Sequence, residues 1–416
     1  MALIHFFHTN FHVNANAVAK LTLTLDKKQH FVSLLFAISL SDTNDTACRN
    51  PDGSEDGCET KGNSDLKDSE KFFIQYNNVP IGLEKFCDKI FVTVPRRRYG
   101  IPSTLNYVGL YDGSSPALKP YPGADHRVSH YRPRVDECDR LWVVDTGMLE
   151  VPGRVQVQPP AILIYNLKTE ELITRYELKS AVLVNERTPA GLTSITVDVD
   201  PSACDDAHAY INDLATEGLV VFSLRERDSW RIEHDSFKHV SGMNFSVSGH
   251  VINWKDGVFS IALSNIDEEG KRTAYYHPLM STEEFAVDTE ALKNRNKISL
   301  FQLLGDKGPN TQSGSHAYHA ATKTLLFANL ARNAILCWRV DTEMAPANVV
   351  VVARDDVKMV YISDLKVVDD EVWVLVNQIP RFVYSKLNTD EDNFYVHKGN
   401  IRTLIRGTAC DKKRRA

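Results

Sequence analysis

A short motif recurs six times along this 416-residue chain, each time with an aromatic residue in its fourth position. Each copy is followed by apolar or β-branched residues, a turn and a second strand-like run. Successive aromatic residues lie 51, 68, 49, 68 and 46 positions apart. A period near about 40–50 residues is typical of β-propeller blades, which cannot bury their own faces alone. The copies are Asp88–Phe91, Asp139–Trp142, Ala207–Tyr210, Asp256–Phe259, Thr324–Phe327 and Asp370–Trp373.

The repeat predicts an all-β fold, a six-bladed β-propeller whose four-stranded blades surround a central channel. We expect the aromatic motif to form the second strand of every blade. Both faces of that strand are apolar, as expected where a blade packs between two neighbours. For blade three the expected strands are Leu192–Val199, Ala209–Asn212, Leu219–Leu224 and Trp230–His234, and for blade six Val360–Val368, Val372–Val376, Phe382–Leu387 and Phe394–His397.

Composition narrows the class of partner. Hydrophobic residues make up 43% of the chain and charged residues 25%, which is ordinary for a soluble globular protein. The net charge of −6 creates no general attraction for nucleic acid. The repeat region has no apolar run near the roughly 18 residues that a membrane helix needs. We therefore expect neither a nucleic-acid nor a membrane partner, and oligomeric state is left open.

The N-terminal part differs from the repeats. Residues 31–40 form an apolar run after Lys27 and Lys28, and small residues follow it, which is the anatomy of a secretory signal. The alternative is that this run is a buried strand. The expected organisation is an N-terminal extension with the signal segment at 1–41, a polar flexible linker at 42–70, the propeller at 71–410 and a basic tail at 411–416.

Two pairs among the seven cysteines fit the repeat. Cys138 precedes Trp142 by four residues and Cys204 precedes Tyr210 by six, so both lie at the same end of neighbouring blades. That placement suits a disulfide between blades two and three.

The other cysteines are placed less firmly. Cys337 lies in blade five and Cys410 follows blade six, so a bridge would attach the C-terminus to an adjacent blade. Cys48 and Cys58 can close a small loop before the repeats, which leaves Cys87 unpaired.

Disulfides indicate an oxidising compartment, and we expect a secreted, extracellular protein. In that setting the N-x-S/T sequons at Asn44 and Asn244 are candidate glycosylation sites. The alternative is a reduced cytosolic protein with scattered buried thiols.

Propeller topology predicts where a ligand would bind. Loops that join second to third strands emerge on the same face as loops that join fourth to first strands. Gly305–Gly314 and Arg354–Tyr361 are expected among the latter. The second-to-third loops are expected to start at Pro95, Asp145, Asp213, Ser264, Leu330 and Asn377.

Polar side chains gather at these strand ends, and a polar ring around a channel mouth is a natural binding site. The alternative is that they only stabilise turns, which is the commonest role of Asn and Asp in loops. The candidate ligand-binding residues are Asp145, Asn212, Asp213, Asn329, Asp364 and Asn377.

The segment Val135–Gly147, which reads VDECDRLWVVDTG, closely resembles the signature of the insect yellow / major royal jelly protein family. The resemblance covers roughly residues 71–410. Three further segments resemble the family's first blade and one its last: Tyr76–Gly82, Phe91–Arg96, Gly100–Tyr107 and, in the last blade, Tyr361–Val367.

The resemblance implies a secreted six-bladed propeller with two disulfides and a role in catechol and amine biology. We expect a protein of melanin and cuticle pigmentation that acts on or binds a catechol-derived metabolite such as dopachrome. One alternative is a non-catalytic binder of biogenic amines such as serotonin or dopamine in the channel, and another is a structural or interaction protein. By resemblance to the amine-binding relatives, Asn377 is the expected contact from the last blade.

The chemistry leaves enzyme and binder both open. An amine site needs an anion and an apolar or aromatic wall, and Asp145, Asp213 and Asp364 are the candidate anions. Dopachrome conversion needs a base for a carbon-bound proton and a group that stabilises the resulting charge. No spacing selects a catalytic histidine from His250, His316 and His319.

No cofactor or metal site is expected, because the pair His316 and His319 lacks a partnered third ligand. A six-bladed lactonase with a divalent metal in its channel is the competing enzyme hypothesis, and the family resemblance argues against it. The chain has no Gly-x-Ser-x-Gly elbow, which argues against a serine hydrolase.

Overall fold

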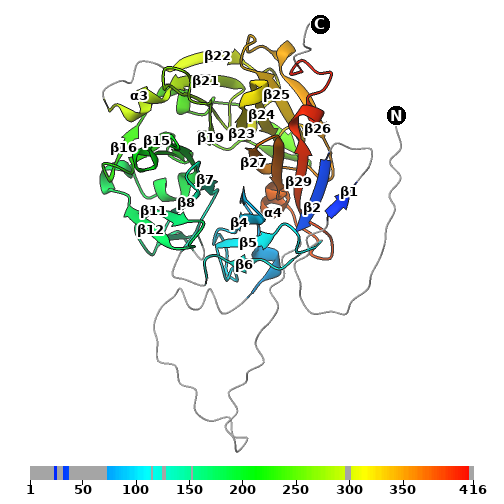
Figure 1. Cartoon of the computed structure of the whole chain (residues 1–416). Helices are drawn as coiled ribbons and strands as arrows, with labels where there is room; N and C mark the ends of the chain where they lie inside the picture. Colours follow the sequence, from blue (N-terminus) through cyan, green and yellow to red (C-terminus); the bar gives the residue numbers. More distant parts are fainter. Residues whose placement is uncertain are drawn as a thin grey trace, which may run out of the picture.

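The computed structural model describes residues 73–113, 116–123, 128–150, 153–295 and 301–411, together with the backbone of two strands at 23–25 and 31–36. Its sheets form a ring of six antiparallel blades, which confirms the predicted six-bladed propeller (Figure 1). The linker at 42–70, the sequon at Asn44, Cys48, Cys58 and residues 412–416 lie outside the described residues.

Each of the first five blades is a four-stranded sheet. Blade one contains β3 (Gly82–Phe86), β4 (Lys89–Thr93), β5 (Leu105–Gly109) and β6 (Lys119–Pro120); blade two β7 (Arg134–Val135), β8 (Arg140–Asp145), β11 (Ala161–Asn166) and β12 (Leu172–Glu177); blade three β13 (Leu192–Asp198), β14 (His208–Asp213), β15 (Gly218–Ser223) and β16 (Asp228–Ile232); blade four β19 (Val258–Leu263), β20 (Thr273–Pro278), β21 (Glu283–Asp288) and β22 (Gln302–Asp306); blade five β23 (Ser313–His319), β24 (Thr324–Asn329), β25 (Ala334–Arg339) and β26 (Val350–Arg354).

Blade six contains β27 (Ile362–Val368), β28 (Glu371–Val376) and β29 (Phe394–Asn400), and strands from the N-terminal part extend it. Two hairpins decorate the loops, β9 (Met148–Leu149) with β10 (Val155–Gln156) and β17 (Phe245–Val247) with β18 (His250–Ile252). The short helices are α2 (Thr188–Gly191), α3 (Thr289–Lys293), α4 (Ile379–Tyr384) and α5 (Ile401–Leu404), and the 3-10 turns are η1 (Gln75–Asn77), η2 (Ser180–Val182), η3 (Cys204–Asp206), η4 (Asp235–Phe237), η5 (Ala320–Thr322) and η6 (Pro346–Asn348).

The hydrophobic core is divided among the contacts between blades. In β8, Leu141 and Val143 pack toward blade one, whereas Trp142 and Val144 pack toward blade three. Both faces of the strand are therefore buried, as the sequence pattern predicts. Burying an aromatic side chain of this size contributes roughly 1.5–3 kcal/mol, so these strands stabilise two interfaces at once.

Two expectations are wrong in detail. Phe259 lies on β19, the innermost strand of blade four, rather than on its second strand. The predicted loop start at Ser264 consequently follows a first strand and lies at the opposite end of the channel from the other predicted loop starts. Phe382–Leu387 is also not the third strand of blade six: helix α4 occupies Ile379–Tyr384, with Pro380 in its first turn where a missing N–H is tolerated.

The outer strand of blade six comes from the N-terminal part. Strand β2 (Phe31–Phe36) pairs antiparallel with β29, and β1 (Leu23–Leu25) pairs with β2 (Figure 1). Residues 31–36 of the apolar run thus form a strand, which was the alternative to a signal segment. Whether it is also cleaved as a signal stays a prediction.

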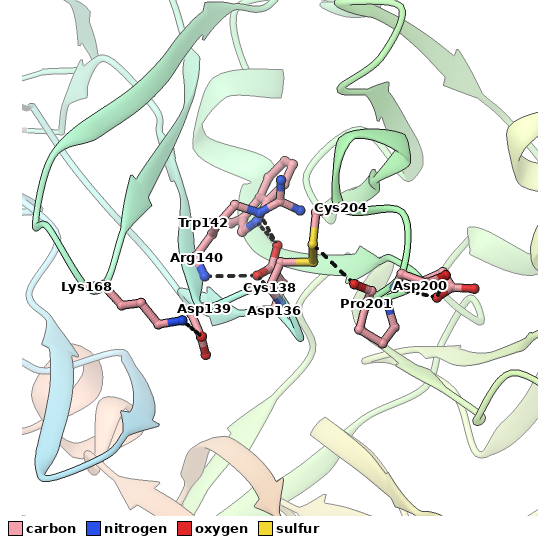
Figure 2. The surroundings of a disulfide bond; sticks show 10 residues. Asp136, Cys138, Asp139, Arg140, Trp142, Lys168, Asp200, Pro201 and Cys204 are labelled. Carbon is pink, nitrogen blue, oxygen red and sulfur yellow. Dashed lines mark hydrogen bonds and ion pairs between the residues drawn. A yellow bond between two sulfur atoms is a disulfide. The ribbon is translucent and has the colours of Figure 1, made fainter.

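Both predicted disulfides are present, Cys138–Cys204 and Cys337–Cys410. The fifth described cysteine, Cys87, is exposed and free. Beside the first disulfide, the buried Asp136 carboxylate accepts hydrogen bonds from Arg140 Nε and Trp142 Nε1, each at 2.7 Å (Figure 2). It also accepts from two backbone N–H groups of the same loop. Asp136 therefore fixes this loop against the core tryptophan.

The ring has two ends, which we name by their loops. Face A carries the second-to-third and fourth-to-first loops, including residues 307–312 and 355–361 as predicted. Face B carries the first-to-second and third-to-fourth loops, and the Cys138–Cys204 disulfide lies there.

Candidate functional site

The predicted ligand-binding residues lie on the first or second strand of a blade, or directly after it, and toward face A. All are at most 4% exposed. These six residues are Asp145 at the end of β8, Asn212 and Asp213 on β14, Asn329 on β24, Asp364 on β27 and Asn377 after β28.

Their polar atoms bond mainly to backbone and across blades. Asp364 accepts from Leu83 N at 3.0 Å and Ser315 Oγ at 2.9 Å, which joins blade six to blades one and five. Asn377 Nδ2 donates to Pro80 O at 2.9 Å. These hydrogen bonds connect neighbouring blades. That Asp364 and Asn377 also contact a ligand stays a prediction.

Three more of these residues contact neighbouring blades, their own blade or a loop. Asn212 Nδ2 donates to Val258 O of blade four at 2.9 Å. Asp213 forms a buried ion pair with Arg231 at 2.9 Å. Asn329 Nδ2 donates to backbone carbonyls of the loop at 310–312.

Asp145 holds the segment that leads into the channel. Its carboxylate accepts from the N–H groups of Val128 and Ser129, both at 2.8 Å, and from Gly147 N at 2.9 Å. The same segment carries Tyr131, whose hydroxyl donates to Glu150, and Arg132, which contacts inner strands of three blades. Asp145 therefore fixes the backbone that precedes these two side chains.

The three consecutive arginines after β4 have different environments. Arg96 is 3% exposed and donates to the carbonyls of Ile101, Pro102 and Val128, so it is structural. Arg98 stacks on Phe382 of α4, with its guanidinium 4.0 Å from the ring centre.

Arg97 belongs to a charged group on face A. Its Nε hydrogen-bonds Glu150 Oε2 at 3.4 Å, and Tyr131 Oη donates to the other oxygen of that carboxylate. Burial opposes ionisation of Arg97, but Tyr131 and Glu150 outweigh it and raise the pKa of the guanidinium. Arg97 is therefore a permanent cation at this end of the channel, and it also interacts electrostatically with Tyr361.

Asp256 is a second carboxyl in this region and interacts electrostatically with Arg187 and Arg97. It ends the long face A loop from blade three to blade four. Burial raises the pKa of its carboxyl to about 6, and the positive charges of Arg187 and Arg97 offset that only in part. Among the described residues, its carboxylate forms no side-chain hydrogen bond. A carboxyl with this pKa can accept a proton near neutral pH.

Aromatic side chains stand beside these charges. The rings of Trp254 and Tyr361 meet edge to face with centres 6.0 Å apart, and Trp254 Nε1 donates to Tyr384 Oη at 2.6 Å. Tyr361 has φ of +59°, which a bulky residue rarely adopts, and such strain concentrates at functional sites. Asp256 and Tyr361 also interact electrostatically, so the acid and the aromatic wall are neighbours.

These aromatic residues and Asp256 are the part of the site that sequence reasoning missed. Trp254 and Asp256 follow the hairpin β17–β18 inside a long irregular loop, and Tyr384 lies on α4, which was expected to be a strand. In the sequence Asp256 is the first residue of the fourth repeat motif. No local pattern distinguishes it from a turn aspartate.

The histidines considered for catalysis are dispersed. His250 lies near Tyr384 on face A, with ring centres 5.6 Å apart. His319 is ion-paired with Asp370 at 3.0 Å, away from this group. His316 is buried between blades four and five, where burial lowers its pKa to about 3 and keeps it neutral.

His316 also belongs to a buried group with His277 and Glu284 whose ligand atoms lie within 4.8 Å of one another. Lys307 Nζ stands 2.9 Å from Glu284, in the place where a cation would bind. Burial opposes ionisation of Glu284, but Lys307 and His277 outweigh it and lower the pKa of the carboxyl. The one carboxylate of this donor set is thus already paired with Lys307, so the set does not fit a metal.

The sequence is similar to a known protein family and to named insect proteins. Residues 128–410 match the sequence profile of the family described as "Major royal jelly protein". The chain is 39% identical over 361 residues to "L-dopachrome tautomerase yellow-f" of Drosophila melanogaster, covering 82% of this chain and 83% of that protein.

It is also 36% identical over 365 residues to "Protein yellow" of Drosophila yakuba, covering 83% of this chain and 66% of that protein. Among solved structures, virginiamycin B lyase from Staphylococcus aureus superposes with a TM-score of 0.44 at 10% identity, covering 78% of this chain and 95% of that one. That similarity is too weak to support a functional argument. No helix in the described part of the chain is long and apolar enough to cross a membrane.

Proposed function

Because this chain belongs to the yellow / major royal jelly protein family, we propose that it is a secreted pigmentation protein that acts on a catechol-derived metabolite. The proposed reaction is the tautomerisation of a dopachrome-like aminochrome at face A of the channel. The observation that carries the proposal is Asp256, a carboxyl with a pKa of about 6 beside arginines and an aromatic wall.

The reaction needs no oxidant, because it only relocates two protons within one molecule. One carbon-bound proton leaves each of two carbons of the five-membered ring, and one proton is delivered to each quinone oxygen, so that the six-membered ring becomes aromatic. A base removes a carbon-bound proton in each transfer. Ionised Asp256 is the proposed base. Burial raises the pKa of Tyr361 well above its ordinary value, so its hydroxyl is protonated and suited to donate a hydrogen bond to the quinone oxygen.

Arginine would orient the substrate. Dopachrome carries a carboxylate next to the reacting carbon, and a guanidinium pairs with a carboxylate in a fixed plane. Arg187 is exposed and interacts with Asp256, and Arg97 uses only Nε for side-chain hydrogen bonds within the described residues. Either cation, placed beside the base, would hold the substrate's carbon–hydrogen bond toward Asp256.

The six polar residues predicted at the channel mouth have a structural role in this proposal. We propose that Asp145, Asn212, Asp213, Asn329, Asp364 and Asn377 keep the blade ends in register around the ligand. In particular, Asp145 positions the segment that carries Tyr131. The family's link to secretion and the exposed sequon at Asn244 support an extracellular glycoprotein.

A non-catalytic amine binder is the second candidate, and the aromatic wall favours it. Above pH 6 the ionised Asp256 would pair with an ammonium group, while Trp254 and Tyr361 would contact an indole or catechol ring. Serotonin and dopamine have this combination of charge and ring. An interaction role without a small ligand is the third.

The test follows dopachrome absorbance with the purified secreted protein and a matched blank. Wild type should accelerate the decay, and Asp256→Asn should lose about 10²-fold or more of that acceleration. The exposed Asp390→Asn is the matched control and should behave as wild type. Stoichiometric binding of dopamine or serotonin by calorimetry, with no turnover, would replace the enzyme proposal by the binder.

A further inference from the structure

The channel has a second opening on face B, with a cavity of about 190 Å³. Inner strands of five blades line it: β7, β13, β19, β23 and β27. It lies at the end of the channel away from Asp256 and Trp254, so it is separate from the site described above.

Positive side chains dominate its wall. Arg134, Arg272 and Lys366 line the cavity, against one lining carboxylate, Glu137, whose side chain is 44% exposed. Hydroxyl groups of the inner strands complete a polar surface. Three cations on a concave wall offer several N–H donors to an acceptor in the cavity.

The hydrogen-bonding capacity of these cations is not used up by their neighbours. Lys366 Nζ donates to Pro133 O at 3.2 Å, and its nearest carboxylates, Asp364 and Glu84, stand at 3.5 and 4.0 Å. That side chain is 8% exposed and has three N–H groups. At least one donor therefore remains for a ligand in the cavity.

Arg272 also has an N–H donor without a hydrogen-bond partner in the described structure. Its Nη1 donates to Asp198 at 3.1 Å, and Glu137 lies 3.6 Å from Nη2. Its Nε is buried and has no hydrogen-bond partner in the described structure. Arg134 has its nearest carboxylate, Glu84, at 3.7 Å. Buried donors left unpaired are costly, so an acceptor in the cavity would stabilise the fold.

Arg132 divides this cavity from face A. Its guanidinium donates to Ser363 O at 2.7 Å and to Thr193 O at 3.0 Å, and it stacks over Phe259 at 3.8 Å. It thereby joins the inner strands of blades three, four and six across the channel. A ligand on face B would not reach Asp256.

We propose that the face B cavity is a binding site for a small oxyanion, either inorganic phosphate or a small organic carboxylate. One ordered water needs only about 10–15 Å³ of such space, so the cavity has room for a molecule of several heavy atoms. Arginine and lysine together supply the planar and point-charge donors that oxyanions accept from. The bound anion would join five blades at the channel end.

Calorimetric titration of the purified protein with inorganic phosphate, and separately with succinate, tests the proposal at low ionic strength. At least one anion should bind with a stoichiometry near one. Arg134→Gln and Lys366→Met should each weaken that binding by tenfold or more. Far-ultraviolet circular dichroism and thermal unfolding establish that each variant is folded.

Arg225→Gln is the matched control, because it removes a face B charge that is paired with Asp206 outside the cavity. It should bind as wild type. Absence of saturable binding for both anions would overturn the proposal, as would equal affinities for wild type and folded Arg134→Gln. Asp256→Asn should leave anion binding unchanged, so this result is independent of the pigment chemistry.

Discussion

Replacing Asp256 by asparagine should stabilise the protein at neutral pH while removing its proposed activity. Burial raises the pKa of this carboxyl from 3.8 to about 6. Each pKa unit corresponds to about 1.36 kcal/mol, so ionised Asp256 costs the folded state about 3 kcal/mol at pH 7.5. Asparagine has the same shape and carries no charge, so the variant avoids that cost.

The sign of the pH dependence follows from linkage. Between the unfolded and folded pKa values the native state binds more protons than the unfolded state, so stability contributed by this group falls as pH rises through that window. The cost is complete above about pH 6 and shrinks to about 1 kcal/mol at pH 4.5. The stabilisation by Asp256→Asn should shrink with it.

Chemical denaturation at pH 7.5 and pH 4.5, with the exposed Asp390→Asn as the control, measures the effect. For a propeller of this size, 3 kcal/mol corresponds to about 4 °C in midpoint temperature. A variant that is destabilised at pH 7.5, or whose gain is the same at both pH values, would refute the assignment of a raised pKa to Asp256.

Three further predictions concern the fold. Asp136→Ala should lower the free energy of unfolding by about 3–5 kcal/mol, because it leaves the buried Arg140 without its carboxylate; a loss below about 1 kcal/mol in guanidinium denaturation would contradict this. Removing the Cys138–Cys204 disulfide, which closes a 66-residue separation, should cost about 4 kcal/mol by loop entropy, and unchanged unfolding of the double serine variant would contradict that estimate. N-terminal sequencing of the secreted product tests the signal prediction at 1–41: a first residue near 42 supports cleavage, whereas a product that retains residues 31–36 supports β2 as the permanent outer strand of blade six.

The blade count and the disulfides were predictable because they depend on local patterns that repeat. Each aromatic strand must be apolar on both faces, as Leu141 and Trp142 show by packing toward different neighbours. Blade four is the exception to the prediction that the aromatic motif forms the second strand. There Phe259 lies on the innermost strand, and Arg132 stacks on its ring. The same motif can therefore serve the channel as well as the core between blades.

The site itself was only partly predictable. Strand-end residues such as Asn377 were predictable because propeller topology places the second-to-third loops on one face, yet the structure uses the polar atoms of Asn377 to join blades. Asp256 and Trp254 come together from one long loop, and Arg97 reaches them from another blade. Their meeting depends on tertiary packing across the ring, which no local spacing records. Burial, which raises the pKa of Asp256, is likewise a property of the assembled fold.

The most direct test of the central claim is the rate of dopachrome conversion with substrate deuterated at the ring carbons that lose protons. If Asp256 removes a carbon-bound proton on face A, wild type should convert the deuterated substrate more slowly than the ordinary one, and Asp256→Asn should convert neither above the blank. Conversion of both substrates by a folded Asp256→Asn variant at the wild-type rate would contradict the account.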